Sequence, residues 1–130
     1  MLNPKKAILL YDGYCNLCIQ VIKILEFICY ISPRYRKNLE IKPFQKSNLI
    51  IKEYSLKKSY LREKIHLIDK DGSISKGSEA IYKLKNYFPL LKFLFLFFNT
   101  KIGKKLYSLI SRNRYKIFGC NKYCYMPKTF

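Results

Sequence analysis

The sequence predicts an α/β sandwich with a small central mixed sheet and a helical C-terminal extension. Three observations lead to this fold class. The apolar run at 7–11 is typical of a strand that is buried on both faces. Residues 15–31 follow it and repeat apolar side chains with the period of a helix. The turn sequence DKDG at 69–72 then predicts a hairpin between two short strands.

The first helix and the second strand follow from local signals. Ser32 and Pro33 are expected to end the helix, because a residue before proline avoids helical geometry. Residues 39–44 alternate in polarity, and Pro43 among them indicates an edge strand or the end of a strand. The apolar face of the helix consists of Cys18, Val21, Ile22, Leu25 and Cys29.

The second half of the chain mixes short strands with helices. Residues 48–60 are polar and predict a short helix with loops, and residues 64–68 predict the third strand of the sheet. The hairpin returns through 73–76. Ser78 is expected to cap a helix that ends near Tyr87.

A last helix is predicted to begin after Asn99 or Thr100, either of which can cap it. The order of strand, helix, strand, helix, hairpin and helices is the thioredoxin-like arrangement of an α/β sandwich. We expect one domain over 1–130, with a helical extension at about 90–119 and a tail at 120–130. The apolar face of the last helix consists of Ile102, Leu106, Leu109, Ile110 and Ile117.

Length and cysteine content favour an intracellular globular domain over a small secreted protein held together by disulfides. At 130 residues the chain can bury a core without disulfides. Five cysteines are too few for a small disulfide-stapled scaffold, and an odd number leaves one thiol over. The N-terminal apolar run is shorter than that of a signal peptide. We therefore expect a monomer in the reducing cytoplasm.

The charge is strongly basic, with 26 Lys and Arg against 8 Asp and Glu and a net charge of +18. Such a charge attracts nucleic acid and anionic lipid. The basic residues are dispersed, however, which indicates a solvated surface, so we do not expect a nucleic-acid partner. The apolar run at 88–98 is about half of the ~20 residues that span a bilayer. It predicts no transmembrane segment but leaves contact with a membrane surface open.

The dithiol Cys15-x-x-Cys18 lies where the first strand passes into the first helix. Free N–H groups at a helix N-terminus stabilise an anion by about 0.3–2 kcal/mol, so they favour the thiolate of Cys15. Cys18 lies one turn on and can reach the same sulfur. We expect an exposed Cys15 to attack a disulfide and a shielded Cys18 to resolve the mixed disulfide, without a metal or organic cofactor.

Asp12 precedes the dithiol by three residues and allows two interpretations. As a catalytic residue its carboxylate would accept the proton of the resolving thiol. As a structural residue it would cap the loop or the start of the helix. His66, the only histidine, is expected to be an ordinary strand residue, although a Cys–His pair would need it beside Cys15.

The tail contributes two more cysteines, Cys120 and Cys124. Together with Cys15 and Cys18 they could form a zinc site with four thiolate ligands, which is the alternative structural function. As redox groups, one of them would relay electrons to the dithiol or form a second couple. Otherwise they are small hydrophobic residues of a packed tail. Cys29 is expected in the core.

Several motifs resemble the DCC family of predicted thiol-disulfide oxidoreductases. The signature Asp12-x-x-Cys15-x-x-Cys18 lies in YDGYCNLC, and further matching motifs are IKPFQKS (41–47), IDKDGSISKGSEAI (68–81), RNRYKIFG (112–119), and Cys124 with Pro127. The resemblance implies a thioredoxin-like fold and dithiol chemistry at Cys15 and Cys18.

The same resemblance directs attention to Gly13 in the signature and to Asn113 and Arg114 on the last helix. We expect these two side chains to hydrogen-bond loop carbonyls near the site. The implied partners are a disulfide-bearing protein or a small-molecule thiol, and an unidentified electron donor. Unlike thioredoxins, the chain has no proline before its third strand, in LREKIHL.

Overall fold

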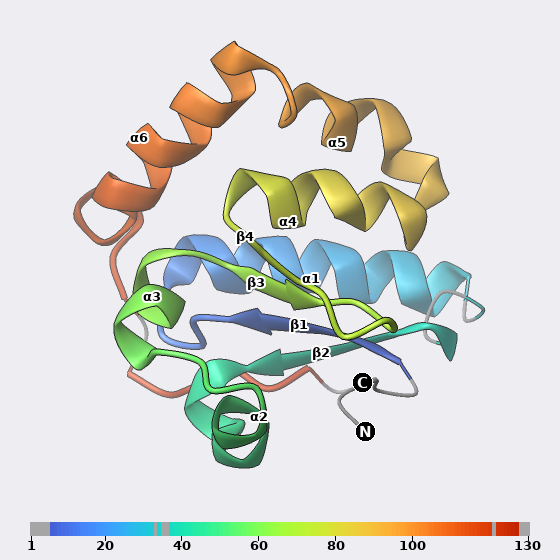
Figure 1. The fold of residues 1–130 in the computed structure, drawn as a ribbon. Coiled ribbons are helices and arrows are strands. Elements are labelled where there is room, and N and C mark those ends of the chain that lie inside the picture. Colours follow the sequence, from blue (N-terminus) through green and yellow to red (C-terminus); the bar gives the residue numbers. More distant parts are fainter. Residues whose placement is uncertain (1–5, 33, 35–36, 121, 128–130) are drawn as a thin grey trace.

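The computed structural model describes residues 6–32, 34, 37–120 and 122–127, and their central element is a four-stranded mixed sheet (Figure 1). The strands follow the order β2-β1-β3-β4. β1 pairs in parallel with β2, whereas β3 is antiparallel to both β1 and β4. This order confirms the predicted thioredoxin-like α/β fold. The bounds are β1 (Ala7–Tyr11), β2 (Leu39–Pro43), β3 (His66–Ile68) and β4 (Ile74–Lys76).

Helices cover both faces of the sheet. α1 and α4 lie on one face, α2 and α3 lie on the other, and α5 and α6 continue from α4 (Figure 1). Short 3₁₀ helices connect some of these elements: η2 (Phe44–Lys46), η3 (Leu84–Asn86) and η4 (Pro89–Leu91). The α-helices are α1 (Asn16–Ile31), α2 (Asn48–Glu53), α3 (Lys58–Glu63), α4 (Ser78–Lys83), α5 (Lys92–Phe97) and α6 (Lys101–Phe118).

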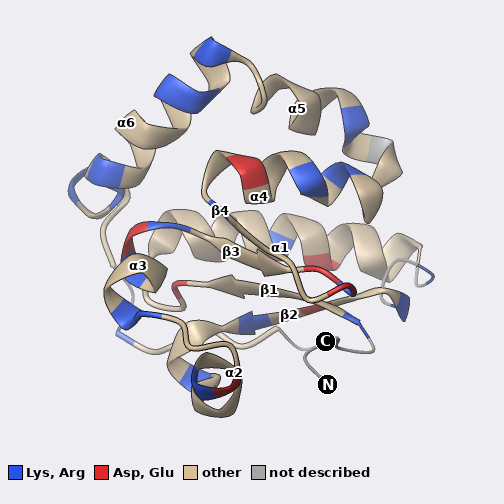
Figure 2. Ribbon diagram, viewed as in Figure 1, with Lys and Arg blue, Asp and Glu red and all other residues tan. Residues whose placement is uncertain are grey.

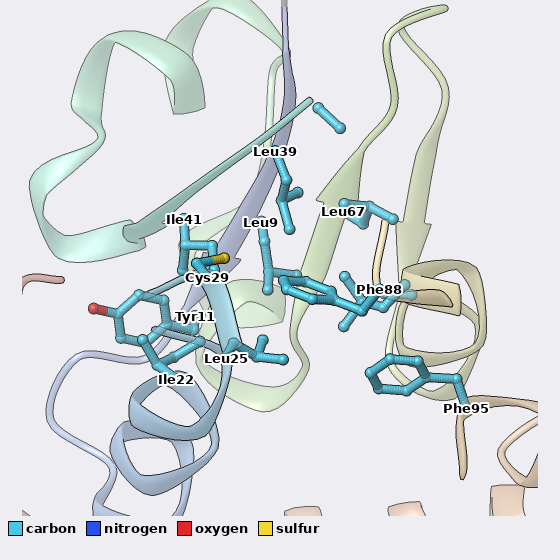
Figure 3. Packing of buried hydrophobic residues seen from close by; sticks show 13 residues of the cluster. Leu9, Tyr11, Ile22, Leu25, Cys29, Leu39, Ile41, Leu67, Phe88 and Phe95 are labelled. Carbon is cyan, nitrogen blue, oxygen red and sulfur yellow. The ribbon is translucent and has the colours of Figure 1, made fainter. Parts of the chain in front are cut away.

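β1 is buried along its whole length because its alternating side chains enter two separate cores. Leu9 and Tyr11 point into the larger core, against α1 and the end of the α4–η3 segment (Figure 3). Ile8 and Leu10 enter the smaller core beside α2 and α3. This is the physical reason for the unbroken apolar run at the start of the chain. Cys29 belongs to the larger core, as predicted.

Several element boundaries differ from those expected. The third strand begins at His66, two residues late, and the segment at 48–60 contains parts of two helices, α2 and α3. Gly77, with φ +62°, takes the N-cap position of α4, and Ser78 is its first helical residue. Glycine adopts that backbone conformation without strain, which explains why the chain turns there. Pro33, predicted to end the first helix, lies outside the described residues.

α6 begins where predicted, because the Thr100 hydroxyl accepts a hydrogen bond from Gly103 N at 3.0 Å. Its apolar stripe, however, does not face the domain. Ile102 is 71% exposed and Ile117 is 65% exposed, whereas Gly103 and Arg114 are the buried residues of the helix. The face that packs is therefore rotated away from the apolar stripe.

The apolar run at 88–98 is buried over only part of its length. Phe95 enters the larger core, but Phe93 is 86% exposed. No acidic residue follows Glu79 in the sequence, and α5 and α6 carry only basic charges (Figure 2). Basic residues also lie on most of the other helices (Figure 2). In the part of the chain that is described, no helix is sufficiently long and apolar for a membrane span.

Replacement of Leu9 by alanine tests the two-sided burial of β1. Leu9 is fully buried in the larger core, so its truncation should lower the free energy of unfolding by about 2–5 kcal/mol in urea denaturation. Ile24→Ala on the exposed side of α1 is the matched control and should change it by less than about 0.5 kcal/mol. Equal losses in the two variants would contradict this assignment of the core.

Candidate functional site

Cys15 is the N-cap residue of α1, as the sequence predicted. β1 ends at Tyr11, and a short turn brings the chain round, with Cys15 N donating to Asp12 O at 3.3 Å. The sulfur of Cys15 then accepts a hydrogen bond from Cys18 N at 3.4 Å. The side chain therefore satisfies one of the free N–H groups of the first turn, and a negative charge on sulfur is favoured there.

The second thiol reinforces this preference. A hydrogen bond from the Cys18 thiol lowers the pKa of Cys15 to about 7, although burial opposes the shift. The positive charge of Arg114 lowers this pKa further, and the carboxylate of Asp12 raises it. The same hydrogen bond raises the pKa of Cys18 well above the ordinary range, and burial adds to that rise. The arrangement therefore favours the thiolate at Cys15 and the protonated thiol at Cys18.

The exposure of the two cysteines is the reverse of the expected one. Cys15 is 0% exposed, whereas Cys18 is partly exposed. The reason is the C-terminal segment, residues 119–120 and 122–127, which runs beside the β1–α1 junction (Figure 1). Cys15 pairs with Cys120 of this segment in an isolated antiparallel bridge, and the next residue, Asn16, donates its N–H to Gly119 O at 3.3 Å.

Further contacts hold the C-terminal segment in place. Tyr125 N donates to Gly13 O at 3.0 Å, and the Tyr11 hydroxyl donates to Tyr125 O at 2.5 Å. The Asn16 side chain donates to Phe118 O at 2.9 Å, at the end of α6. The segment is therefore fixed on both sides of the nucleophile.

Asp12 is a buried carboxylate, 3% exposed, and four donors from three parts of the chain surround it. One oxygen accepts from Tyr14 N at 3.0 Å and from Gln45 Nε2 at 2.7 Å. The other accepts from the Tyr115 hydroxyl and from the Arg114 guanidinium at 3.3 Å. Arg114 and Asp12 thus form a buried ion pair directly below the dithiol loop.

Arg114 bonds a main-chain carbonyl, as expected, but that carbonyl lies at the end of α3 rather than in a loop. Its NH1 group donates to Glu63 O at 3.1 Å, and the Ser111 hydroxyl donates to the same carbonyl at 2.6 Å. Asn113 does not share this role, because its amide donates to Leu109 O of its own helix at 2.9 Å. The expectation that Asn113 bonds a loop carbonyl is therefore wrong, since the side chain turns back along α6.

Gly13 allows close packing beneath the loop. A Cβ atom there would lie 2.4 Å from the sulfur of Cys124 and 3.0 Å from Pro43 Cβ, so a larger residue has no room. Gly13 N donates to Gln45 Oε1 at 2.9 Å. Gln45 therefore holds the loop through its carbonyl and Asp12 through its amide. Burial raises the pKa of Cys124.

Gln45 and Tyr115 were not identified as site residues in the sequence analysis. Each touches Asp12 across a long stretch of chain, 33 and 103 residues respectively, so local patterns give no sign of the contact. A signal was present, however: Gln45 lies in the motif IKPFQKS and Tyr115 in RNRYKIFG. Both motifs were recognised only as matches to a family.

The space beside Cys18 is a small cavity of about 90 Å³, lined by residues that include Cys18, Asp12 and Arg114. A larger groove of about 670 Å³ lies next to it, between α6 and the loop before β3. The groove and the cavity share three lining residues: Lys64, Tyr107 and Arg114.

The four cysteines considered as zinc ligands are not gathered into one centre. Among the described residues, which include all five cysteines, no group of three or more potential metal ligands comes together. His66 is buried in β3, and its Nδ1 lies 2.9 Å from Lys64 O. Burial lowers the pKa of this imidazole.

Comparison with known proteins agrees with this site. The family model described as DCC1-like thiol-disulfide oxidoreductase matches residues 9–120, which include the dithiol, Asp12 and α6. A chloroplastic DCC family protein of Arabidopsis thaliana is 29% identical over 129 residues, covering 94% of this chain and 70% of the plant protein. No solved structure matches significantly. The chain therefore belongs to the DCC1-like thiol-disulfide oxidoreductase family.

Proposed function

We propose that this protein exchanges disulfides through Cys15 as the nucleophile and Cys18 as the resolving thiol. The observation that carries the proposal is the sulfur of Cys15 at the N-cap of α1, where it accepts hydrogen bonds from the N–H and the thiol of Cys18. A thiolate is the reactive form of cysteine, and a second thiol one turn away is what release of a mixed disulfide requires.

The reaction has two exchange steps. The Cys15 thiolate attacks one sulfur of the substrate disulfide, and the other substrate sulfur leaves as a thiolate that takes a proton from solvent. Cys18 then loses its proton to solvent and attacks the sulfur of Cys15. The bond between Cys15 and the substrate breaks, the second substrate sulfur leaves as a thiolate that takes up a proton, and a Cys15–Cys18 disulfide remains. The substrate gains two electrons, and an electron donor must reduce the protein again.

The buried position of Cys15 sets a condition on this chemistry. An incoming disulfide can reach its sulfur only after the C-terminal segment moves away from the start of α1, because that segment pairs with Cys15. The cavity beside Cys18 and the adjoining groove give the incoming molecule a place to lie. We propose that a disulfide-bearing protein or a small disulfide enters from this side.

Asp12 acts in this proposal as a positioning residue. Both of its oxygens already accept hydrogen bonds, from Tyr14, Gln45, Arg114 and Tyr115. To take the proton of Cys18, the carboxylate would have to give up one of these donors. Its geometry therefore favours the structural interpretation, in which it holds the dithiol loop and the guanidinium of Arg114.

The setting of the reaction is also a proposal. Five cysteine thiols are suited to a reducing compartment, which we take to be the cytoplasm, although the plant relative is named as chloroplastic. We expect a monomer that works with a separate thiol donor. Basic residues are spread over most helices rather than gathered at the dithiol, so we assign them no nucleic-acid partner (Figure 2).

Turnover of a small disulfide tests the nucleophile. With bis(2-hydroxyethyl) disulfide as substrate and dithiothreitol as donor, Cys15→Ser should lose the protein-dependent rate, because serine can still cap α1 but cannot attack sulfur. Cys29→Ala, in the core of the same helix, is the control and should retain the rate. Undiminished turnover by folded Cys15→Ser would remove Cys15 from the mechanism.

The pH dependence of alkylation tests the thiolate. The rate at which iodoacetamide modifies Cys15, followed by mass spectrometry, should rise with pH through a midpoint near 7, because only the thiolate reacts. Cys18→Ala should move the midpoint toward the ordinary value of 9.0, since it removes the strongest cause of the lowered pKa. A midpoint near 9.0 in the unmodified chain would contradict the proposal.

Two variants test the positioning role of Asp12, because they should shift the pKa of Cys15 in opposite directions. Asp12→Asn should lower the pKa of Cys15 by removing a nearby negative charge, and Arg114→Met should raise it by removing a positive one. Because Asp12→Asn leaves the buried guanidinium of Arg114 unpaired, the free energy of unfolding of this variant should be lower by about 3–5 kcal/mol. If Asp12 were the proton acceptor, release of the second substrate thiol would stop in Asp12→Asn; we expect it to continue.

A further inference from the structure

The register between the dithiol loop and the C-terminal segment places a third thiol opposite the nucleophile. Cys15 and Cys120 are direct partners in an antiparallel bridge. The residue after Cys15 donates to the residue before Cys120, through Asn16 N and Gly119 O at 3.3 Å. This is the pattern of a non-hydrogen-bonded pair, in which the Cα atoms lie about 4.5 Å apart and the side chains share one face.

That spacing is suitable for a covalent link. Disulfides join residues whose Cα atoms are about 4.4–6.8 Å apart, so Cys15 and Cys120 fall within the range without movement of the backbone. The other tail cysteine does not have this relation. Cys124 packs against Gly13, and its sulfur lies 4.0 Å from Gln45 Oε1. Cys120 is also exposed, so its thiol is accessible from solvent.

The approach of Cys120 to Cys15 is built into the end of α6. Gly119 caps this helix with φ +75°, a conformation that favours glycine, and its N–H still bonds Tyr115 O at 3.0 Å. The side chain of Asn16 donates to Phe118 O at 2.9 Å on the other side of the turn. The turn therefore directs the chain from α6 straight to the start of α1.

We propose that Cys120 is a second resolving thiol for Cys15, an inference that rests on the proposed function. In a mixed disulfide between Cys15 and a substrate, the Cys120 thiolate attacks the sulfur of Cys15, after its proton has passed to solvent. The bond between Cys15 and the substrate breaks, and the substrate leaves as a thiolate that takes up a proton. A Cys15–Cys120 disulfide replaces the mixed disulfide, so this step needs no external oxidant or reductant.

This second disulfide has a different effect from the first. A Cys15–Cys18 bond lies within α1, whereas a Cys15–Cys120 bond ties the C-terminal segment covalently to the dithiol loop. The segment already covers Cys15 when both thiols are free. The Cys15–Cys120 form is therefore closed to further substrate until Cys18 or an external thiol attacks it.

The Cys18→Ala variant isolates this step. We would incubate the reduced, full-length variant with oxidised glutathione at mildly alkaline pH, quench it with acid and alkylate it. Peptides mapped without reduction should contain a Cys15–Cys120 disulfide and no lasting glutathione adduct at Cys15. Cys18→Ala/Cys124→Ala, the matched control, should give the same disulfide.

Removal of the proposed thiol should reverse the result. In Cys18→Ala/Cys120→Ala the glutathione adduct at Cys15 should persist, because no second thiol releases it. A lasting adduct in Cys18→Ala alone, or a disulfide from Cys15 to Cys124, would overturn the role of Cys120 while leaving Cys15 as the nucleophile. If Cys15 forms neither an adduct nor a disulfide in any of these variants, the proposed function itself fails together with this inference.

Discussion

The buried ion pair between Asp12 and Arg114 is the interaction on which the site depends. It links the end of β1 to α6, and through Gln45 and the Glu63 carbonyl it also reaches the ends of β2 and α3. Removing two charges from water costs several kcal/mol for each ion, which the pair recovers only with good geometry and further hydrogen bonds. Asp12 meets that requirement, because its two oxygens accept from four donors.

The same pair influences the reactivity of the dithiol. Its two charges shift the pKa of Cys15 in opposite directions, and the hydrogen bond from Cys18 is the main reason why this pKa is lowered. The ion pair thus contributes position more than charge. It fixes the loop from Asp12 to Cys15, and that loop determines where the sulfur meets the N-terminus of α1.

Features with local causes could be predicted from the sequence. The apolar run at 7–11 indicated a strand buried on both faces, the dithiol lay at a helix start, and Thr100 capped the last helix. Each of these depends on residues within a few positions of one another, as caps and periodic patterns do. Motif resemblance directed attention to Arg114, although its ion pair with Asp12 was not predicted.

Features with distant causes could not be predicted in this way. Cys15 is covered by a segment that lies more than a hundred residues away in the sequence. For this reason Cys15, which was expected to be exposed, is buried, and Cys18 is the more exposed of the two thiols. The orientation of α6 also depends on contacts that its own sequence pattern does not indicate. Its apolar stripe predicts an inward face, but Arg114 turns toward Asp12, and Gly103, where a Cβ would lie 2.1 Å from Phe97 O, allows close contact with α5. These two contacts, rather than apolar burial, set the rotation of the helix.

The coverage of Cys15 by the end of the chain also affects the order of events during synthesis. A domain leaves the ribosome with its N-terminus first, and contacts between distant residues can form only after both partners have emerged. β1, β2 and α1 are complete long before residues 119–127 emerge. Cys15 is therefore synthesised well before the segment that shields it, and during that interval its thiol is open to glutathionylation or to capture by another polypeptide.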